Sequence, residues 1–252
     1  MSSSPIAAAR RRESEIMDQL DLEPARHRAA LAGLARLNAW SGSARMLWPA
    51  IRQLIQERRI AEGKRNRKGE PDDPIRLLDV ATGSGDVPTR VALRARRNRI
   101  PLEVTGIDRS PIALEKARQT ALRHGVAARF LEYDVLGSLP AATFDVVTCS
   151  LFLHHLSEDE AITLLERLRQ LASSLVLVCD LDRRAAGFLL TWAATRLLTR
   201  SDVVRFDGPA SVLAAFTPEE VQRLAGKAGL AGATVRRRWP FRWLLEWRAP
   251  AP

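Results

Sequence analysis

The stretch Leu77-Leu78-Asp79-Val80-Ala81-Thr82-Gly83-Ser84-Gly85-Asp86-Val87-Pro88 decides the fold of this chain. An apolar run that ends in an acid and continues into two glycines predicts a buried parallel strand that turns sharply into a helix beside a ligand. Gly83 and Gly85 permit backbone torsions barred to other residues and let the main chain approach that ligand. The first turn of the helix would present unpaired N–H groups to it. Nucleotide-binding folds of several chemistries share such a turn, so the rest of the chain must identify the ligand.

From residue 75 onward, strand and helix patterns alternate regularly. Helix starts are marked by Ser110 and Thr217, each followed by proline, and by Ser157 with Glu160 in a capping box. Strands separated by helices imply right-handed crossovers and therefore a doubly wound, parallel α/β sheet covered on both faces. The predicted strands are 75–80, 102–108, 128–133, 144–149, 174–180, 233–237 and 241–247.

The segments on either side of this alternation divide the chain. Apolar side chains at helical spacing before residue 62 predict two helices that break at Ser41-Gly42-Ser43. Another helix is predicted over 185–200, and a loop at Phe206-Asp207-Gly208-Pro209. The expected organisation is a disordered tail at 1–15, an N-terminal helical cap at 16–62, a linker at 63–74, and a main domain at 75–252 with lid helices at about 183–215.

Composition narrows the class of protein. The chain has 252 residues, of which 46% are hydrophobic, enough for one sizeable domain with a core. No run approaches the roughly 18 to 20 apolar residues of a membrane span, and no apolar core of signal-peptide type follows the N-terminal charges. We therefore expect a cytoplasmic protein. Cys149 and Cys179 lie in no metal-binding spacing, so we expect two buried, reduced thiols and no metal site.

The net charge of +10 has two interpretations. Basic clusters occur around residues 58–68, 94–99 and 236–238, which could bind an anionic partner such as nucleic acid. Each cluster, however, adjoins a predicted helix end or strand and is not interleaved with exposed aromatic residues. A solvated surface therefore explains the charge better, and nucleic acid is an unfavoured alternative.

Four features at predicted strand ends together make the chain resemble the class I S-adenosylmethionine-dependent methyltransferases. The first is the opening turn with Asp79. The second is Asp108, which ends the second strand, where a carboxylate can accept hydrogen bonds from ribose hydroxyls. The third is Asp134 after the third strand, although an acid there is also common turn chemistry. The fourth is the fourth strand and its exit, Phe144-Asp145-Val146-Val147-Thr148-Cys149-Ser150-Leu151-Phe152-Leu153-His154-His155.

The resemblance implies a Rossmann-like, mostly parallel seven-stranded sheet with an antiparallel last strand, to which N-terminal helices and an inserted helical lid are added. It also implies S-adenosyl-L-methionine as cofactor and S-adenosylhomocysteine as product. Ala81 replaces the first of the family's three glycines, and the turn is similar to that of the quinone-biosynthesis C-methyltransferases. The positions implied to bind the cofactor are Asp79, Ala81, Thr82, Gly83, Gly85, Asp108, Arg109, Asp134, Val135 and Ser150.

The candidate catalytic residues are His154, His155 and Asp180. Both histidines leave the fourth strand at the mouth of the expected site, where an imidazole with a pKa near neutrality suits a general base. Either one could instead pack or hold the loop. Asp180 and Asp182, at the end of the fifth strand, could orient or accept from a substrate.

The apolar helices around the main domain favour a small, partly hydrophobic acceptor. Aromatic residues could line its cavity or simply belong to the core; they are Trp40, Trp48, Phe188, Trp192, Phe206 and Phe216. We therefore predict methyl transfer to oxygen or carbon of a small aromatic, phenolic or polyketide-like molecule. An RNA methyltransferase and a non-catalytic cofactor-binding scaffold are the alternatives, and the oligomeric state stays open.

Overall fold

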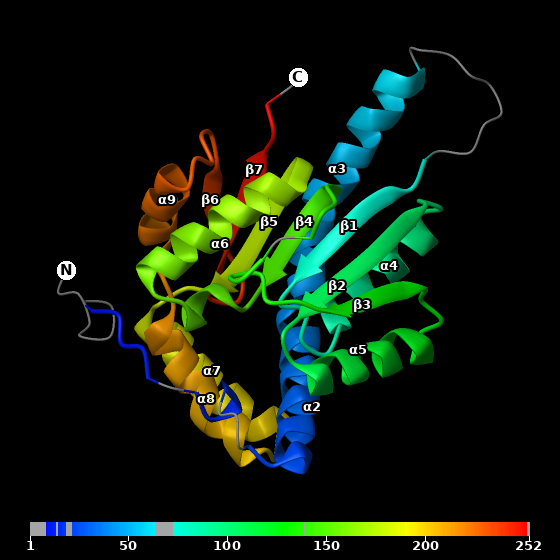
Figure 1. The fold of residues 1–252 in the computed structure, drawn as a ribbon. Helices are drawn as coiled ribbons and strands as arrows, with labels where there is room; N and C mark the ends of the chain where they lie inside the picture. Colours follow the sequence, from blue (N-terminus) through cyan, green and yellow to red (C-terminus); the bar gives the residue numbers. More distant parts are fainter. Residues whose placement is uncertain (1–8, 14, 19–21, 64–72, 139, 251–252) are drawn as a thin grey trace.

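The computed structural model describes residues 9–13, 15–18, 22–63, 73–138 and 140–250. Its centre is a seven-stranded sheet with the order β3-β2-β1-β4-β5-β7-β6 (Figure 1). Strands β1 to β5 are parallel, and β7 is antiparallel to both of its neighbours. The predicted fold class is therefore confirmed. The strands are β1 Ile75–Val80, β2 Leu102–Asp108, β3 Ala128–Glu132, β4 Phe144–Ser150, β5 Ala172–Leu181, β6 Thr234–Arg238 and β7 Arg242–Arg248.

Helices cover both faces of the sheet because successive strand residues point to opposite sides. Leu77 packs with helices α3 (Ser43–Gly63) and α4 (Asp86–Arg97), whereas the adjacent Leu78 packs with α6 (Glu158–Leu171) and α9 (Pro218–Lys227). Helix α5 (Pro111–Arg123) lies beside α4 and packs against β3. Each face of the sheet is thus a buried core, and this explains why the central strands read as nearly continuous apolar runs.

The predicted helix starts are present. The Ser110 hydroxyl accepts a hydrogen bond from the Ala113 N–H at 3.2 Å. Ser157 with Glu160, and Thr217 with Glu220, each form a reciprocal capping box. These caps satisfy N–H groups that the first turn of a helix leaves unpaired.

A second group of helices lies beyond the carboxyl ends of the parallel strands. Helices α2 (Pro24–Ser41), α7 (Ala185–Leu198) and α8 (Asp202–Ala214) are drawn below the sheet in Figure 1, with the short 3-10 helix η1 (Ile16–Asp18) against α8. The predicted break between α2 and α3 is confirmed at Gly42, whose φ is +74°. Open α/β sheets bind ligands at this edge, so these helices stand over the expected site.

The loop predicted at residues 206–209 is wrong, because α8 continues through it. A Cβ on Gly208 would lie 2.6 Å from the Thr195 side chain of α7. This glycine therefore serves the close packing of two helices and not a turn. A Gly-Pro pair favours a turn in the sequence, but here the neighbouring helix α7 requires the glycine for packing.

The structure also bears on the predictions for the tail, the linker, the cysteines and membrane-spanning helices. Residues 64–72 of the predicted linker, and residues 1–8 and 14 of the predicted tail, lie outside the described residues. Arg10, within the expected tail, hydrogen-bonds to the carbonyl oxygens of Ala214, His154 and Leu156. Both cysteines are buried and unpaired in disulfides, as predicted. Among the described helices, none is long and apolar enough to cross a lipid bilayer.

Candidate active site

A large cavity of about 640 Å³ lies at the carboxyl ends of β1, β2, β3 and β4. Residues of α2, α7 and α8 line it from the other side. Its volume is within the range of roughly 300–1,000 Å³ found for small-molecule and cofactor sites. The predicted site residues that line it are Asp79, Ala81, Thr82, Gly83, Asp108, Arg109, Asp134, Val135, Ser150, His154 and His155.

The Gly-rich turn has three residues with positive φ. Ala81, Gly83 and Gly85 have φ values of +53°, +54° and +68°, the left-handed region that favours glycine. A Cβ on Gly83 would meet nothing within 4 Å, so this residue faces open space. A Cβ on Gly85 would lie 2.8 Å from that of Ala117. Gly85 therefore allows the turn to pack closely against α5. It is predicted to bind the cofactor, but it is not among the residues that line the cavity.

Asp79 is the buried anchor of that turn. Its carboxylate accepts hydrogen bonds from the Thr82 hydroxyl at 2.7 Å and the Thr148 hydroxyl at 2.6 Å. Desolvation by burial raises the pKa of Asp79 to about 7, although both hydroxyl hydrogen bonds act in the opposite direction. Asp79 thus ties the end of β1 to β4 and to the turn.

Asp108 holds the other side of the turn. Its two carboxylate oxygens accept from the Gly83 N–H at 2.8 Å and the Ser110 N–H at 2.9 Å. Burial raises the pKa of this carboxyl, while the two backbone hydrogen bonds lower it. Each carboxylate oxygen retains a further lone pair, so Asp108 can still accept from a ligand hydroxyl. Asp134 lines the same part of the cavity and also accepts from the Leu136 N–H at 2.9 Å, so it is a turn residue as well.

The opposite part of the cavity contains the two histidines on the turn that follows β4. His154 is 4% exposed, and its Nδ1 atom lies 2.7 Å from Oδ1 of Asp180. Asp180 also accepts from the backbone N–H groups of His154 and Leu181. Burial raises the pKa of Asp180, but the charge of His154 and these hydrogen bonds outweigh burial and hold it below its usual value. An ionised Asp180 can only accept, so Nδ1 of His154 is the donor. The Nε2 atom lies on the other side of the ring, toward the cavity-lining Glu15.

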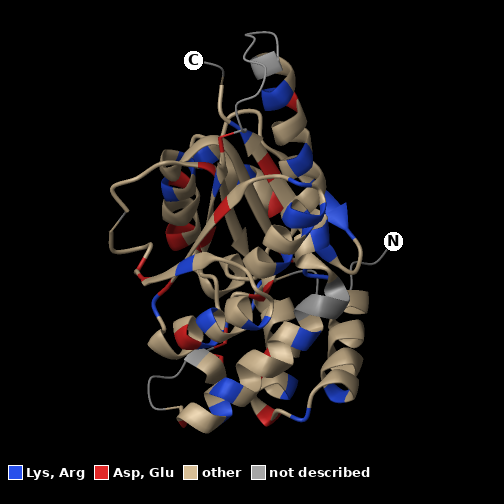
Figure 2. Cartoon of the chain, turned by 90° about the vertical axis from the view of Figure 1, so that its right-hand side faces the viewer, with Lys and Arg blue, Asp and Glu red and all other residues tan. Residues whose placement is uncertain are grey.

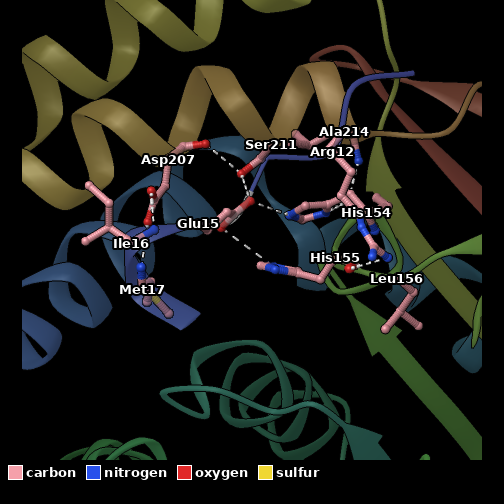
Figure 3. A network of polar contacts seen from close by, with 12 residues as sticks. Arg12, Glu15, Ile16, Met17, His154, His155, Leu156, Asp207, Ser211 and Ala214 are labelled. Atoms are coloured by element: carbon pink, nitrogen blue, oxygen red, sulfur yellow. Dashed lines mark hydrogen bonds and ion pairs between the residues drawn. The ribbon is translucent and has the colours of Figure 1, made fainter. Parts of the chain in front are cut away.

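Glu15 is a site residue that the sequence did not single out. Its carboxylate lies 3.6 Å from Nε2 of His154 and 3.8 Å from Nε2 of His155. It is 9% exposed and accepts from the Ser211 hydroxyl at 2.6 Å. Figure 3 shows Glu15 pointing toward both imidazoles from the N-terminal segment. No local pattern in the sequence marks this acid, because a separation of 139 residues to His154 is bridged only by folding.

Hydrogen bonds hold this N-terminal segment against α8 and the β4 exit. The Ile16 and Met17 N–H groups donate to the Asp207 carboxylate at 2.9 and 3.0 Å. Arg10 lies over the Phe216 ring, with 3.6 Å between the guanidinium carbon and the ring centroid. Glu15 and Met17 line the cavity, so this segment forms part of the cavity wall.

Some predicted residues lie outside the cavity wall. Asp180 stands behind His154 and does not line it. Asp182 is engaged with Arg237, whose Nε is 3.1 Å from its Oδ2, so it has a structural ion pair. Most of the lining near α2, α7 and α8 is aliphatic, with aromatic rings from different positions than predicted. These lining residues are Leu22, Leu31, Leu34, Leu37, Tyr133, Phe152, Leu190, Ala194, Val212 and Phe241.

The aromatic residues predicted for the cavity have other places. Phe216 is buried in the core on the α6 and α9 side, and Trp48 packs with the α3 and α4 side. Trp192 and Phe206 are 47% and 52% exposed. Phe188 is absent from the cavity lining, and the side chain of Trp40 lies outside the described residues. Aromatic residues at helical spacing were thus a poor guide to the site, because periodicity does not tell which face of a helix meets a cavity.

Comparison with known sequences identifies similar proteins. A family model described as a methyltransferase domain matches residues 77–174. An uncharacterized methyltransferase of Mycobacterium tuberculosis is 30% identical over 184 residues, which are 69% of this chain and 87% of that protein. The demethylmenaquinone methyltransferase of Thermus thermophilus is 38% identical over 88 residues, 34% of this chain. This chain spans only 38% of that enzyme and 31% of the corresponding enzyme of Deinococcus radiodurans.

Solved structures share the fold at low sequence identity. The CurJ carbon methyltransferase has a TM-score of 0.63 and 14% identity, with 92% of this chain and 62% of that chain covered. Magnesium protoporphyrin IX methyltransferase from Synechocystis PCC 6803 has a TM-score of 0.50 and 18% identity, with 79% and 81% covered. The seven-stranded sheet and its surrounding helices are therefore an architecture that several methyltransferases share.

Proposed function

The chain belongs to the class I S-adenosylmethionine-dependent methyltransferases, and from this we propose that it transfers a methyl group to oxygen or carbon of a small aromatic, phenolic or polyketide-like acceptor. The observation that carries the proposal is one continuous cavity with two chemically different ends. The end at β1, β2 and β3 has backbone and carboxylates, and the end at α2, α7 and α8 has aliphatic walls and two histidines.

The cofactor belongs at the carboxylate end. Gly83 offers an open backbone surface to the methionine part, and Asp108 has lone pairs for the ribose hydroxyls. We assign Asp134 and Val135 to the adenine, and Arg109, Thr82 and Ser150 to other contacts with the cofactor, since all five line the cavity. In this proposal Asp79 and Gly85 act indirectly, by shaping the turn that the cofactor touches.

The acceptor belongs at the aliphatic end. Leu31 and Leu34 of α2, Leu190 of α7 and Val212 of α8 offer apolar contact to a ring or chain. We propose that residues 16–62 act as a cap and about 183–215 as a lid over this end. The names of relatives fit such an acceptor, since they include demethylmenaquinone methyltransferases and a ubiquinone biosynthesis O-methyltransferase of Schizosaccharomyces pombe.

Methyl transfer from a sulfonium is an in-line displacement, so the protein mainly aligns the nucleophile, the methyl carbon and the sulfur. The nucleophile must also lose its proton. We assign the assistance of this proton loss to His154, with its Nε2 atom toward the acceptor. His155 lies beside it, and Asp180 fixes the orientation of the His154 ring.

The basic surface gives less support to an RNA substrate. In Figure 2, Lys and Arg are spread over the helices and the sheet and are interspersed with Asp and Glu. Several arginines of the basic clusters lie in ion pairs, such as Arg237 with Glu219 at 2.8 Å and Arg58 with Asp145 at 3.6 Å. Acidic partners weaken the potential that a phosphate backbone would meet.

Ligand-dependent thermal unfolding tests the proposal. A ligand that binds only the native state stabilises it by about 2.7 kcal/mol at a hundredfold excess over Kd. S-adenosylmethionine and S-adenosylhomocysteine should therefore both raise Tm. Methionine, which lacks the adenosine part, is the control and should raise Tm much less. No stabilisation by either cofactor form would overturn the proposal. Labelled methyl transfer into a cell extract, followed by mass spectrometry of the product, then identifies the acceptor.

A further inference from the structure

Three potential metal ligands from two distant parts of the chain meet at the acceptor end of the cavity. One possible ligand atom from each of Glu15, His154 and His155 lies within 4.8 Å of the other two. The side chains are 5%, 21% and 10% exposed, respectively. All three residues line the cavity, so the group is largely shielded from bulk solvent but open to a ligand.

The surroundings hold each of the three side chains in place. Asp180 fixes the Nδ1 side of His154 at 2.7 Å, and the Ser211 hydroxyl fixes the Glu15 carboxylate at 2.6 Å. The His154 and His155 rings are in contact, with 4.3 Å between their centroids and a tilt of 32°, so each limits the movement of the other. Figure 3 shows the two imidazoles and the carboxylate converging. A histidine held at Nδ1 by a carboxylate is the usual second layer of a metal site, since it orients the ring and makes Nε2 a better ligand.

The distances between these groups leave room for a cation. The separations of 3.6 and 3.8 Å between Glu15 and the two Nε2 atoms are too long for hydrogen bonds. Ligand atoms about 2.0–2.2 Å from one metal ion lie roughly 3–3.5 Å apart. The three groups are therefore close enough for modest side-chain movement to bring one atom of each onto a common ion.

We propose that Glu15, His154 and His155 bind one divalent cation of the Mn²⁺, Co²⁺ or Zn²⁺ type. Two imidazole nitrogens and one carboxylate oxygen suit such ions, whereas Mg²⁺ and Ca²⁺ prefer sites made of oxygen ligands alone. Three protein ligands leave coordination positions open toward the cavity, as in catalytic metal sites. The sequence predicted no metal site, because Glu15 comes from an N-terminal segment that no motif connects to the histidines.

The role of the ion rests on the proposed function. An oxygen of the acceptor can occupy an open position, and a bound cation favours loss of the proton from a hydroxyl by stabilising the resulting negative charge. The ion would therefore orient the acceptor and lower the pKa of its hydroxyl. With its Nε2 atom bound to the ion, His154 would hold the ion and would not itself take the proton, which would pass to solvent as the acceptor oxygen binds.

Direct binding measurements test the site without any methylation assay. Untagged, full-length protein is freed of metal by a chelator and dialysed, then titrated with Co²⁺ in the visible absorption spectrum and with Zn²⁺ by calorimetry. One equivalent should bind, with a Co²⁺ spectrum that indicates nitrogen and oxygen ligands. Glu15→Gln and His155→Ala should each weaken binding at least tenfold, and Asp180→Asn should weaken it by about 10- to 100-fold.

The control is His124→Ala, which removes an exposed imidazole at the end of α5 and should leave binding unchanged. Circular dichroism of the metal-free variants checks that each is folded. The proposal is overturned if the native protein binds no equivalent at micromolar metal, or if one equivalent still binds with native affinity to both Glu15→Gln and His155→Ala. Stabilisation by S-adenosylhomocysteine in metal-free protein is measured separately, so failure of the metal site and failure of the proposed function are distinguishable.

Discussion

His154 and Asp180 form a close, buried side-chain pair at the acceptor end, with 2.7 Å between Nδ1 and Oδ1. Asp180 is 1% exposed and ends β5, whereas His154 lies on the 3-10 turn after β4. Because β4 and β5 are adjacent parallel strands, their carboxyl ends bring the two residues together. The pair fixes which nitrogen of His154 meets the cavity, and four predictions follow from this site and from the turn opposite it.

Substitution of His154 should impair turnover and not cofactor binding. His154→Ala should lower kcat by about 10²- to 10⁴-fold, the range for loss of a group that assists proton removal, while the Kd of S-adenosylhomocysteine stays unchanged. Asp180→Asn should lower kcat in the same direction, because the amide no longer enforces the Nδ1 hydrogen. The measurement is labelled methyl transfer at saturating cofactor, with His124→Ala as control. Near-normal turnover of both His154→Ala and His155→Ala would remove histidine from the mechanism.

Substitution of Asp108 should weaken cofactor binding. Asp108→Asn keeps the shape of the side chain but cannot accept from both backbone N–H groups and the ribose hydroxyls, so cofactor affinity should fall by roughly 1 to 3 kcal/mol. Calorimetry with S-adenosylhomocysteine measures this loss. Asp145→Asn, on the amino-terminal side of β4, is a matched control that should bind normally. Unchanged affinity in Asp108→Asn would contradict the ribose assignment.

The high pKa of Asp79 predicts a pH dependence of stability. A carboxyl with a pKa of about 7 when folded and about 3.9 when unfolded favours the folded state fully below pH 4. This contribution is lost as the pH rises from about 4 to 7, and the loss is on the order of 4 kcal/mol. Asp79→Asn cannot ionise and should lack it.

Urea unfolding of cofactor-free protein at a series of pH values measures this effect. The quantity to follow is the free energy of unfolding of the native protein minus that of Asp79→Asn, because other carboxyls titrate equally in both. The difference should fall between pH 4 and 7 and stay constant above that range. A difference that is independent of pH would mean that Asp79 ionises normally.

The positive φ of Ala81 predicts that the alanine costs stability. An L-residue in the left-handed region loses roughly 1–2 kcal/mol, and glycine loses roughly 0.5–1 kcal/mol of chain entropy instead. Ala81→Gly should therefore raise the free energy of unfolding by about 0.5 kcal/mol or more, and Ala81→Val should lower it. Denaturant unfolding measures both. A destabilised Ala81→Gly would indicate that the methyl group makes a favourable contact in the cavity.

Much of the fold could be predicted from local patterns. Asp79 and Asp108 end apolar runs, and a run that is buried on both faces needs no tertiary information to read as a central parallel strand. Caps such as Ser157 with Glu160 are equally local, since both partners lie within one helical turn. The loop predicted at 206–209 is wrong for the converse reason: Gly208 packs closely against Thr195 of another helix, and α8 runs through the residues that favour a turn.

The sequence by itself therefore determined the sheet, the Gly-rich turn and the family, because these depend on side-chain periodicity and on residues near one another in the chain. Only the tertiary structure decided which residues surround the acceptor. Glu15 meets His154 across 139 positions of sequence, Asp180 stands behind the ring and outside the cavity, and Gly85 packs against Ala117 without lining the cavity. Such roles depend on which face of an element meets the cavity, and the helices that enclose it fix that choice only when the chain has folded.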